Sequence, residues 1–111
     1  MQQGDIIIVA YPFSSFLETK TRPAIIISNN NFHRGDNIII TPITTVINGP
    51  YRTRIFSEDL EEGELLRESS IHYSNVITVE KRLVFKKIAK VKSSAMGKII
   101  EQVMNNFRTT Q

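Results

Sequence analysis

The amino-acid sequence predicts a mainly β protein, a small β-barrel with one C-terminal helix packed on it. Many short runs rich in Ile, Val and Thr are separated by Gly, Pro and Asn residues, as is typical of the short strands of barrels. Near the C-terminus, apolar residues instead recur at helical spacing. The length of 111 residues fits one domain over residues 1–111 with a core of its own.

The most clearly marked strand is Ala24 to Ile27. This run is continuously apolar and ends in the turn-forming cluster Ser28 to Asn31, which is typical of a strand covered on both faces. Pro23 cannot donate a hydrogen bond to a sheet, so we expect it at the first position of this strand. An earlier strand is expected over residues 6–10, and residues 13–21 are expected to form a loop between the two.

The rest of the chain continues the same pattern up to the final helix. Pro42 should weaken or end the strand before it, or place that strand at a sheet edge, and Asn48-Gly49 is a strong turn signal. The acidic segment 57–68 has no clear period and is expected to be a loop that could include a helical turn. The other extended segments expected are 38–41, 43–46, 51–56, 70–74, 76–79 and 85–91.

The final element is an amphipathic helix that begins at Ser93 or Ser94, either of which can cap its first turn. One face of this helix is apolar, and we expect that face to pack on the core. The face consists of Ile99, Ile100, Val103, Met104 and Phe107.

Composition excludes several kinds of site. Cysteine is absent, which excludes disulfides and thiolate metal sites and suits a reducing cytoplasm. His33 and His72 are too few for a histidine zinc site without carboxylate help, so we expect neither metal nor cofactor. The N-terminus lacks a secretion signal and no apolar run is long enough to span a membrane, so we expect a cytoplasmic protein.

The net charge is +3 and the sequence pI about 9.4. Acidic residues crowd into the segment 57–68, which leaves the remainder of the chain distinctly basic. A basic remainder could bind nucleic acid through its phosphates, although an ordinary solvated surface explains the same charge.

Arg22 is the first candidate for a functional side chain. It stands at the entrance of the apolar strand, and Pro23 restricts it to an extended conformation. A guanidinium held in this way offers a planar fork of donors that matches a phosphate. A surface ion pair is the alternative interpretation, and Arg22 alone does not decide between them.

The order of three motifs resembles the MazF/PemK toxins of bacterial toxin–antitoxin modules. Those toxins begin with a Gly-Asp strand, carry an Arg-Pro before an apolar strand, and place a Thr at the end of the next strand. The C-terminal amphipathic helix and the segment Val79 to Leu83 fit the family as well. The matching motifs are Gly4 to Ile7, Arg22 to Ser28 and Thr41 to Thr45.

The resemblance implies an SH3-like barrel of the CcdB/MazF type that forms a homodimer. It implies a metal-independent endoribonuclease that cuts single-stranded RNA, leaves 2′,3′-cyclic phosphate and 5′-hydroxyl ends, and so inhibits translation and growth. The family's catalytic residues correspond to Arg22 and Thr44, and a cognate antitoxin with an acidic C-terminal tail is the implied partner. One departure is Ile77, where many members carry an arginine, so contacts with substrate at that position are undefined.

Other candidates have two interpretations each. His33, in a polar loop, is a candidate general acid or a solvated histidine, and His72 suits a structural hydrogen bond. Phe16 and Phe32 could stack on bases or pack within loops. Four basic side chains have two interpretations: they contact RNA phosphates, or they lie on solvated strand faces. These are Arg52, Arg54, Lys86 and Lys87.

Two other functions remain open on the sequence alone. A CcdB-like toxin shares the barrel but binds DNA gyrase without cleaving anything, and a barrel that lost activity would serve as a binding module. Arg22 and Thr44 favour the nuclease, because a gyrase binder does not need that pair.

Overall fold

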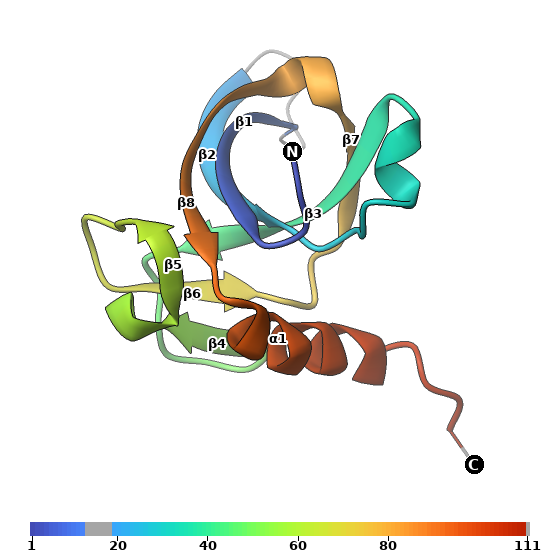
Figure 1. The fold of residues 1–111 in the computed structure, drawn as a ribbon. Helices are drawn as coiled ribbons and strands as arrows, with labels where there is room; N and C mark the ends of the chain where they lie inside the picture. Colours follow the sequence, from blue (N-terminus) through green and yellow to red (C-terminus); the bar gives the residue numbers. More distant parts are fainter. Residues whose placement is uncertain (13–18, 111) are drawn as a thin grey trace.

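The computed structural model describes residues 1–12 and 19–110 and confirms a mainly β half-barrel with one C-terminal helix (Figure 1). The single α-helix in this part of the chain is α1, Ser93–Asn105, and short 3-10 turns are η1 (Phe32–Arg34), η2 (Ser57–Asp59) and η3 (Lys81–Leu83). The strands are β1 (Asp5–Pro12), β2 (Thr19–Ile26), β3 (Asn37–Thr44), β4 (Arg52–Ile55), β5 (Leu60–Gly63), β6 (Ser69–His72), β7 (Ile77–Glu80) and β8 (Val84–Val91).

The strands pair antiparallel in the order β4-β6-β3-β2-β1-β8-β5, and β7 also pairs with β3. Strand β3 changes partners along its length. Residues Asn37 to Ile40 pair with β7, and the last two residues, Ile43 and Thr44, pair with β6. Pro42 lies at this change and neither ends β3 nor leaves it at an edge. The bend at β3 therefore joins the barrel proper to a smaller β3–β6–β4 sheet.

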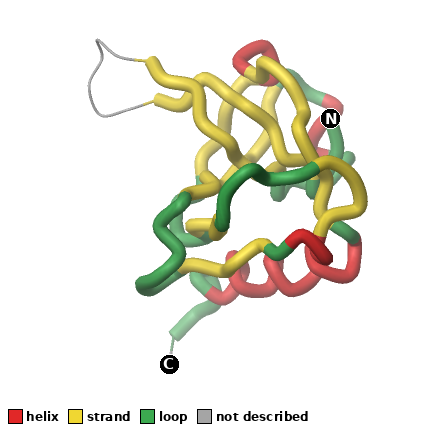
Figure 2. Tube along the Cα trace, turned by 90° about the vertical axis from the view of Figure 1, so that its left-hand side faces the viewer, coloured by secondary structure: helices red, strands yellow, loops and turns green. Residues whose placement is uncertain are grey.

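Strand β2 is covered on both faces, as predicted. Ala24 and Ile26 belong to one buried cluster, together with residues of β1, β3 and β7. Ile25 and Ile27 belong to a second cluster, which also contains the helix residues of α1 that are buried. Figure 2, like Figure 1, places α1 below the strands, where it closes this second cluster.

The start of β2 differs from the prediction. Residues Thr19 to Thr21 pair with β1 and are not loop, and Pro23 lies inside β2 opposite Ile8. The ladder between β2 and β3 ends at Ala24, so at Pro23 only β1 is paired with β2 in the described residues. The missing N–H of Pro23 can then face the side without a strand, which makes an interior proline tolerable.

The acidic segment also differs from the prediction, because it contains the strand β5. This strand pairs with β8 although it shows no apolar alternation. Gly63 permits the pairing. It has a φ of +78°, and a Cβ there would lie 2.2 Å from the carbonyl oxygen of Ile88. Backbone approach and charge hold β5 in place, together with the packing of Leu60 against the core.

The remaining predicted strands lie where the sequence places them, but the helix differs in two respects. Ser93 and Ser94 are its first two residues, and the preceding Lys92 provides no side-chain cap. Met104 and Phe107 are 50% and 65% exposed, so of the predicted apolar face only Ile99, Ile100 and Val103 pack on the core. Among the described residues, every helix falls short of the length and apolar character that crossing a bilayer demands.

Candidate functional site

Arg22 and Thr44 lie at the same end of the β2–β3 ladder. Arg22 is an exposed residue of β2 opposite Val9, and Thr44 is the half-buried last residue of β3. The ladder between the strands ends at the pair Ala24 and Pro42. Its register carried two residues further would set Arg22 opposite Thr44, although β3 turns toward β6 there. The cation and the hydroxyl thus flank the opening where β2 and β3 separate.

The Thr44 hydroxyl has a defined orientation. Its Oγ1 accepts a hydrogen bond of 3.1 Å from the backbone N–H of Val46. A hydroxyl that accepts one bond in this way still has its own proton to donate. Thr44 can therefore offer a donor at a fixed position to an incoming anion.

The β3–β6–β4 sheet extends this site across three strands. Thr44 pairs with Ser70, and Ser70 pairs with Arg54, so the three residues form one row across the sheet. Arg52 pairs with His72, two residues along from Arg54. Because side chains in one row and at alternate positions share a face, the predicted common face of Arg52 and Arg54 also carries Thr44. We call this set, with Arg22, the arginine face.

Both strand arginines of this face are held by contacts. The Arg52 guanidinium donates from Nη1 to the carbonyl oxygen of Pro50 at 3.1 Å. Arg54 forms an ion pair with Glu68 at 3.3 Å, and its guanidinium lies over the ring of Phe56, 4.9 Å from the centroid. Their guanidinium groups are therefore oriented before any ligand arrives, which neither interpretation of the sequence foresaw.

A comparison with protein families identifies the family of this chain. The model of the "PemK-like, MazF-like toxin of type II toxin-antitoxin system" matches residues 2–107. The chain belongs to this toxin family. A search of curated proteins found no match.

Solved structures agree with this family at the level of the fold. The "Mycobacterium tuberculosis toxin MazF-mt6" is 19% identical, with a TM-score of 0.73 over 96% of this chain and 99% of that one. An "Endoribonuclease in complex with its cognate antitoxin from Mycobacterial species" is 16% identical, with a TM-score of 0.77 over 100% and 98%. A MazE-MazF structure from Deinococcus radiodurans is 10% identical, with a TM-score of 0.77 over 99% and 98%.

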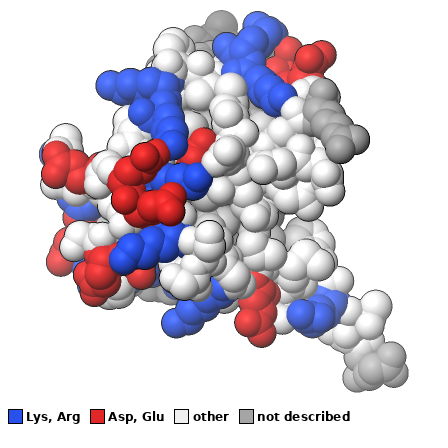
Figure 3. Space-filling model, in the orientation of Figure 1, with Lys and Arg blue, Asp and Glu red and all other residues white. Residues whose placement is uncertain are grey.

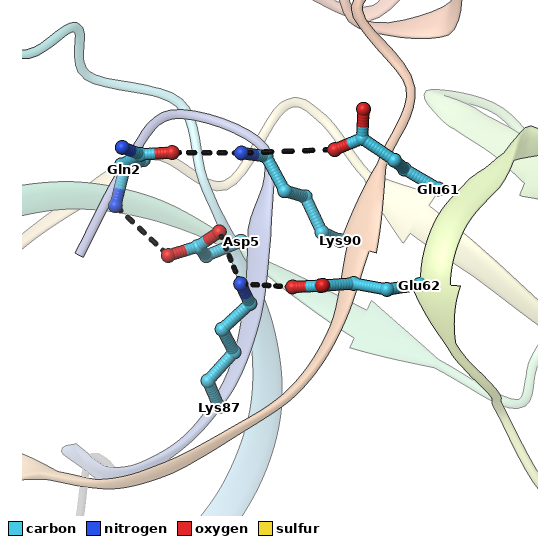
Figure 4. Close-up of polar contacts among 6 residues, drawn as sticks. All are labelled: Gln2, Asp5, Glu61, Glu62, Lys87 and Lys90. Carbon is cyan, nitrogen blue, oxygen red and sulfur yellow. Dashed lines mark hydrogen bonds and ion pairs between the residues drawn. The ribbon is translucent and has the colours of Figure 1, made fainter.

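Lys87 of this MazF-like toxin is engaged elsewhere. Its Nζ forms ion pairs with Glu62 of β5 and, at 3.4 Å, with the buried Asp5 of β1 (Figure 4). Hydrogen bonding between Lys87 and Glu62 raises the pKa of Lys87 and lowers the pKa of Glu62. Lys90 nearby pairs with Glu61 at 3.7 Å. Two carboxylates therefore already neutralise Lys87, which disfavours the predicted phosphate contact there.

The acidic segment of the toxin thus folds back on basic β8, so charge is less segregated in space than along the chain. Figure 3 shows acidic and basic side chains intermingled over β5 and β8. Lys86 is exposed and, as the neighbour of Lys87 in β8, points to the other side of the strand. Of the two β8 lysines predicted to contact RNA, Lys87 is thus the one whose ammonium group is engaged by Asp5 and Glu62 (Figure 4).

His33 is buried, with 9% exposure, and is not a solvated loop residue. Its Nε2 shares a hydrogen bond of 2.6 Å with the Ser28 hydroxyl, and that oxygen also accepts the N–H of Ile39 at 2.9 Å. Burial is the main cause that lowers the pKa of His33, and Lys81 lowers it further. Ser28 follows Arg22 by six residues, about 20 Å of extended chain. His33 therefore contacts the chain beyond the C-terminal end of β2, whereas Arg22 lies within that strand.

The remaining residues singled out in the sequence include two aromatic candidates and one position that lacks a cation. Phe16 lies outside the described residues, and Phe32 is 41% exposed in η1, beside His33. Ile77, the position without the family's arginine, packs against the cluster that contains Ala24 and Ile26. Its side chain is partly buried and takes part in packing. Phe56 and Glu68 were missed, although the alternation from Arg52 through Arg54 would have placed Phe56 on their face.

Proposed function

We propose that this toxin is a metal-independent endoribonuclease that cleaves single-stranded RNA and thereby inhibits translation and growth. The single observation that supports it is the placement of Arg22 and Thr44 at one end of the β2–β3 ladder. A fixed cation and a fixed hydroxyl donor are what a scissile phosphate needs as charge accumulates on its oxygens. Membership of the MazF/PemK family, whose members are generally endoribonucleases, supports the same reaction.

The reaction proceeds through the 2′-hydroxyl of the RNA. This oxygen loses its proton and attacks the adjacent phosphorus, the bond from phosphorus to the 5′-oxygen breaks, and that oxygen takes a proton. The products are a 2′,3′-cyclic phosphate and a 5′-hydroxyl. Arg22 contacts the non-bridging oxygens in bidentate fashion, and Thr44 donates a hydrogen bond to one of them. The role assigned to Arg22 is to stabilise the charge on the phosphate, because a guanidinium is a poor base.

His33 has no part in this proposal. Its contact with Ser28, six residues of chain after Arg22 and beyond the end of β2, suits a structural role instead. Catalysis then rests on alignment of the 2′-hydroxyl and stabilisation of the phosphate charge, which together account for large rate enhancements.

An antitoxin is the partner we expect for this toxin, as in the MazE-MazF structures of similar fold. We propose that the toxin is a cytoplasmic homodimer and that an acidic C-terminal tail of the antitoxin covers the arginine face. A disordered acidic segment that folds on binding suits a surface lined by Arg22, Arg52 and Arg54. Co-purification with a small acidic protein that suppresses cleavage would support this partner, and the lack of any inhibition would count against it.

The test is incubation of purified protein with a long single-stranded RNA in the presence of EDTA. Wild type should make discrete cuts, and Arg22→Ala and Thr44→Ala should each be slower by about 100-fold or more. Arg82→Ala and Thr78→Ala are matched controls, because both residues are exposed and lie outside β1 and β3, the strands that pair with β2. A folded Arg22→Ala variant with full activity would refute the assignment. No cutting by wild type would favour a gyrase binder or an inactive module.

A further inference from the structure

We infer that Arg54 and Phe56 form a nucleotide subsite on the arginine face, and that Glu68 occupies Arg54 until an RNA phosphate displaces it. This inference rests on the proposed function, because it takes RNA as the ligand. It adds a second contact point for the substrate and a residue of the toxin that competes with that substrate.

The position of the subsite follows from the strand register. The pairing of β4 and β6 ends with Ile55 and Ser69, and one further step sets Phe56 opposite Glu68. Arg54 and Ser70 occupy the preceding position on the same face. From Arg54 to Thr44 is a distance of two strand spacings, about 10 Å. A strand of RNA held at Thr44 can therefore reach Arg54 with a nearby phosphate.

The contacts at Arg54 resemble a phosphate site that is filled by a carboxylate. Arg54 Nη2 lies 3.3 Å from Glu68 Oε1, and the Glu68 side chain is 72% exposed while that of Arg54 is 36% exposed. An exposed ion pair of this kind contributes little stability, so it is readily exchanged. A phosphodiester carries the same single negative charge as the carboxylate and offers two oxygens to the guanidinium fork.

Phe56 supplies a surface for a base beside this phosphate. Its ring is 46% exposed, and the Arg54 guanidinium covers it at 4.9 Å. Aromatic rings and arginine planes are the groups on which single-stranded bases stack. A phosphate on Arg54 and a base against Phe56 would belong to adjacent parts of one nucleotide.

A hollow of about 370 Å³ lies next to these two residues. Its size falls in the range of sites that hold a small ligand. Apolar walls come from Leu60, Leu65 and Leu66, and the charged lining consists of Arg54 and Arg67 together with Glu64 and Glu68. The hollow is formed by β4 and by the segment that carries Glu68, so withdrawal of Glu68 from Arg54 opens one side of it.

Glu68 therefore acts as a positioning residue that competes with RNA. In its presence Arg54 is oriented but neutralised, and binding of RNA must first break the ion pair. Removal of the Glu68 charge should tighten the binding of RNA without a change in the chemical step at Arg22 and Thr44. The expected change lies in the KM and not in the kcat.

The experiment measures the Kd for a single-stranded RNA oligonucleotide and steady-state cleavage for the same set of variants. Glu68→Gln should lower the Kd and KM about three- to tenfold and leave the kcat unchanged. Arg54→Gln should raise the Kd and the KM. It should also reduce the slope of the logarithm of the binding constant against the logarithm of the salt concentration by about 0.7, the value for one lost phosphate contact. Phe56→Leu should raise the Kd and the KM without a change in that slope. Glu101→Gln, an exposed carboxylate on α1, is the control.

The double variant Glu68→Gln/Arg54→Gln separates competition from a general gain in charge. If Glu68 acts through Arg54, its removal brings no gain once Arg54 is lost. An equal gain in both backgrounds, or a Glu68→Gln variant that binds as the wild type does, would overturn the inference. If wild type neither binds nor cleaves RNA, the proposed function fails instead, so the two failures are distinguishable.

Discussion

The toxin carries two sets of cations on strands that do not pair with each other, and the burial of a carboxylate partner separates them. Lys87 on β8 pairs with Asp5, whose side chain is 4% exposed, whereas Arg54 on β4 pairs with Glu68, whose side chain is 72% exposed. A buried carboxylate cannot release its cation without a large desolvation cost, and an exposed one can. The contacts of Lys87 are therefore structural, whereas the exposed pair of Arg54 and Glu68 can be exchanged at little cost.

This comparison also shows why charge along the chain is a poor guide to charge in space. The acidic segment 57–68 serves both sets, because Glu62 reaches Lys87 and Glu68 reaches Arg54. One end of the segment is fixed by β5 pairing, and the other precedes β6. Glutamates of one segment thus hold β5 against β8 at Lys87 and neutralise Arg54 on β4.

The largest expected effect is on catalysis at the arginine face. Thr44→Val keeps the shape of the side chain but removes the donor, and we expect cleavage to fall about 100-fold, as on loss of a hydrogen bond to a developing oxyanion. Thr44→Ser restores a donor and should retain most of the activity. Single-turnover rates on one RNA check both. Equal rates for Val and Ser would show that the hydroxyl is not used.

The next effect tests the β8 region through its backbone. Gly63→Ala should destabilise the protein by about 3 kcal/mol, because it combines a positive φ with a Cβ that meets the Ile88 carbonyl. Gly97→Ala is the matched control. Its Cβ would meet nothing within 4 Å on a helix, so it should stabilise by about 0.5–1 kcal/mol. Urea denaturation measures both, and equal values would contradict this account of β5.

A smaller loss of stability is expected from Asp5→Ala, which removes the buried partner of Lys87. We expect about 2 kcal/mol, because Asp5 also accepts the N–H of Gln2 at 2.9 Å. Glu68→Ala, which removes the exposed partner of Arg54, should change the free energy of unfolding by less than about 1 kcal/mol. If the two substitutions cost the same, the distinction between the two sets of cations is lost.

The smallest effect concerns His33, which belongs to neither set. Burial lowers the pKa of this histidine, so the unfolded chain binds more protons than the folded one below about 6.5. The contribution of His33 to stability is present above that pH and is lost as the pH falls. The groups that act on it are Lys81, the N-terminal amine and Asp5. Melting temperatures from about pH 7.5 to about pH 5 should fall less steeply in His33→Gln.

The sequence predicted most strands and the helix, because β-branched runs and helical spacing are local signals. It could not place β5, whose pairing depends on Gly63 and on Lys87 and Lys90 of a distant strand. It placed Pro23 at the first position of β2. The end of the β2–β3 ladder, which leaves room for a proline inside the strand, depends on tertiary structure and cannot be predicted from local sequence. Met104 and Phe107 follow the helical period yet extend past the core.

Part of the candidate site could also be predicted from the sequence. Arg22 and Thr44 come from a resemblance in motif order, and the common face of Arg52 and Arg54 from their spacing. The partners of the cations could not be foreseen, since Glu62 and Glu68 look alike in one acidic run. Only strand pairing reveals that one meets Lys87 beside Asp5 and the other meets Arg54 beside Phe56.

The most direct test of the central claim is the chemistry of the RNA ends after cleavage by wild-type protein in EDTA. The account predicts a 2′,3′-cyclic phosphate and a 5′-hydroxyl at each cut, and no cut where the nucleotide before it carries a 2′-O-methyl group. These ends require the 2′-hydroxyl as nucleophile, which is the reaction that a cation and a fixed donor can support. Products with a 3′-hydroxyl and a 5′-phosphate would contradict it, because water would then have attacked the phosphorus.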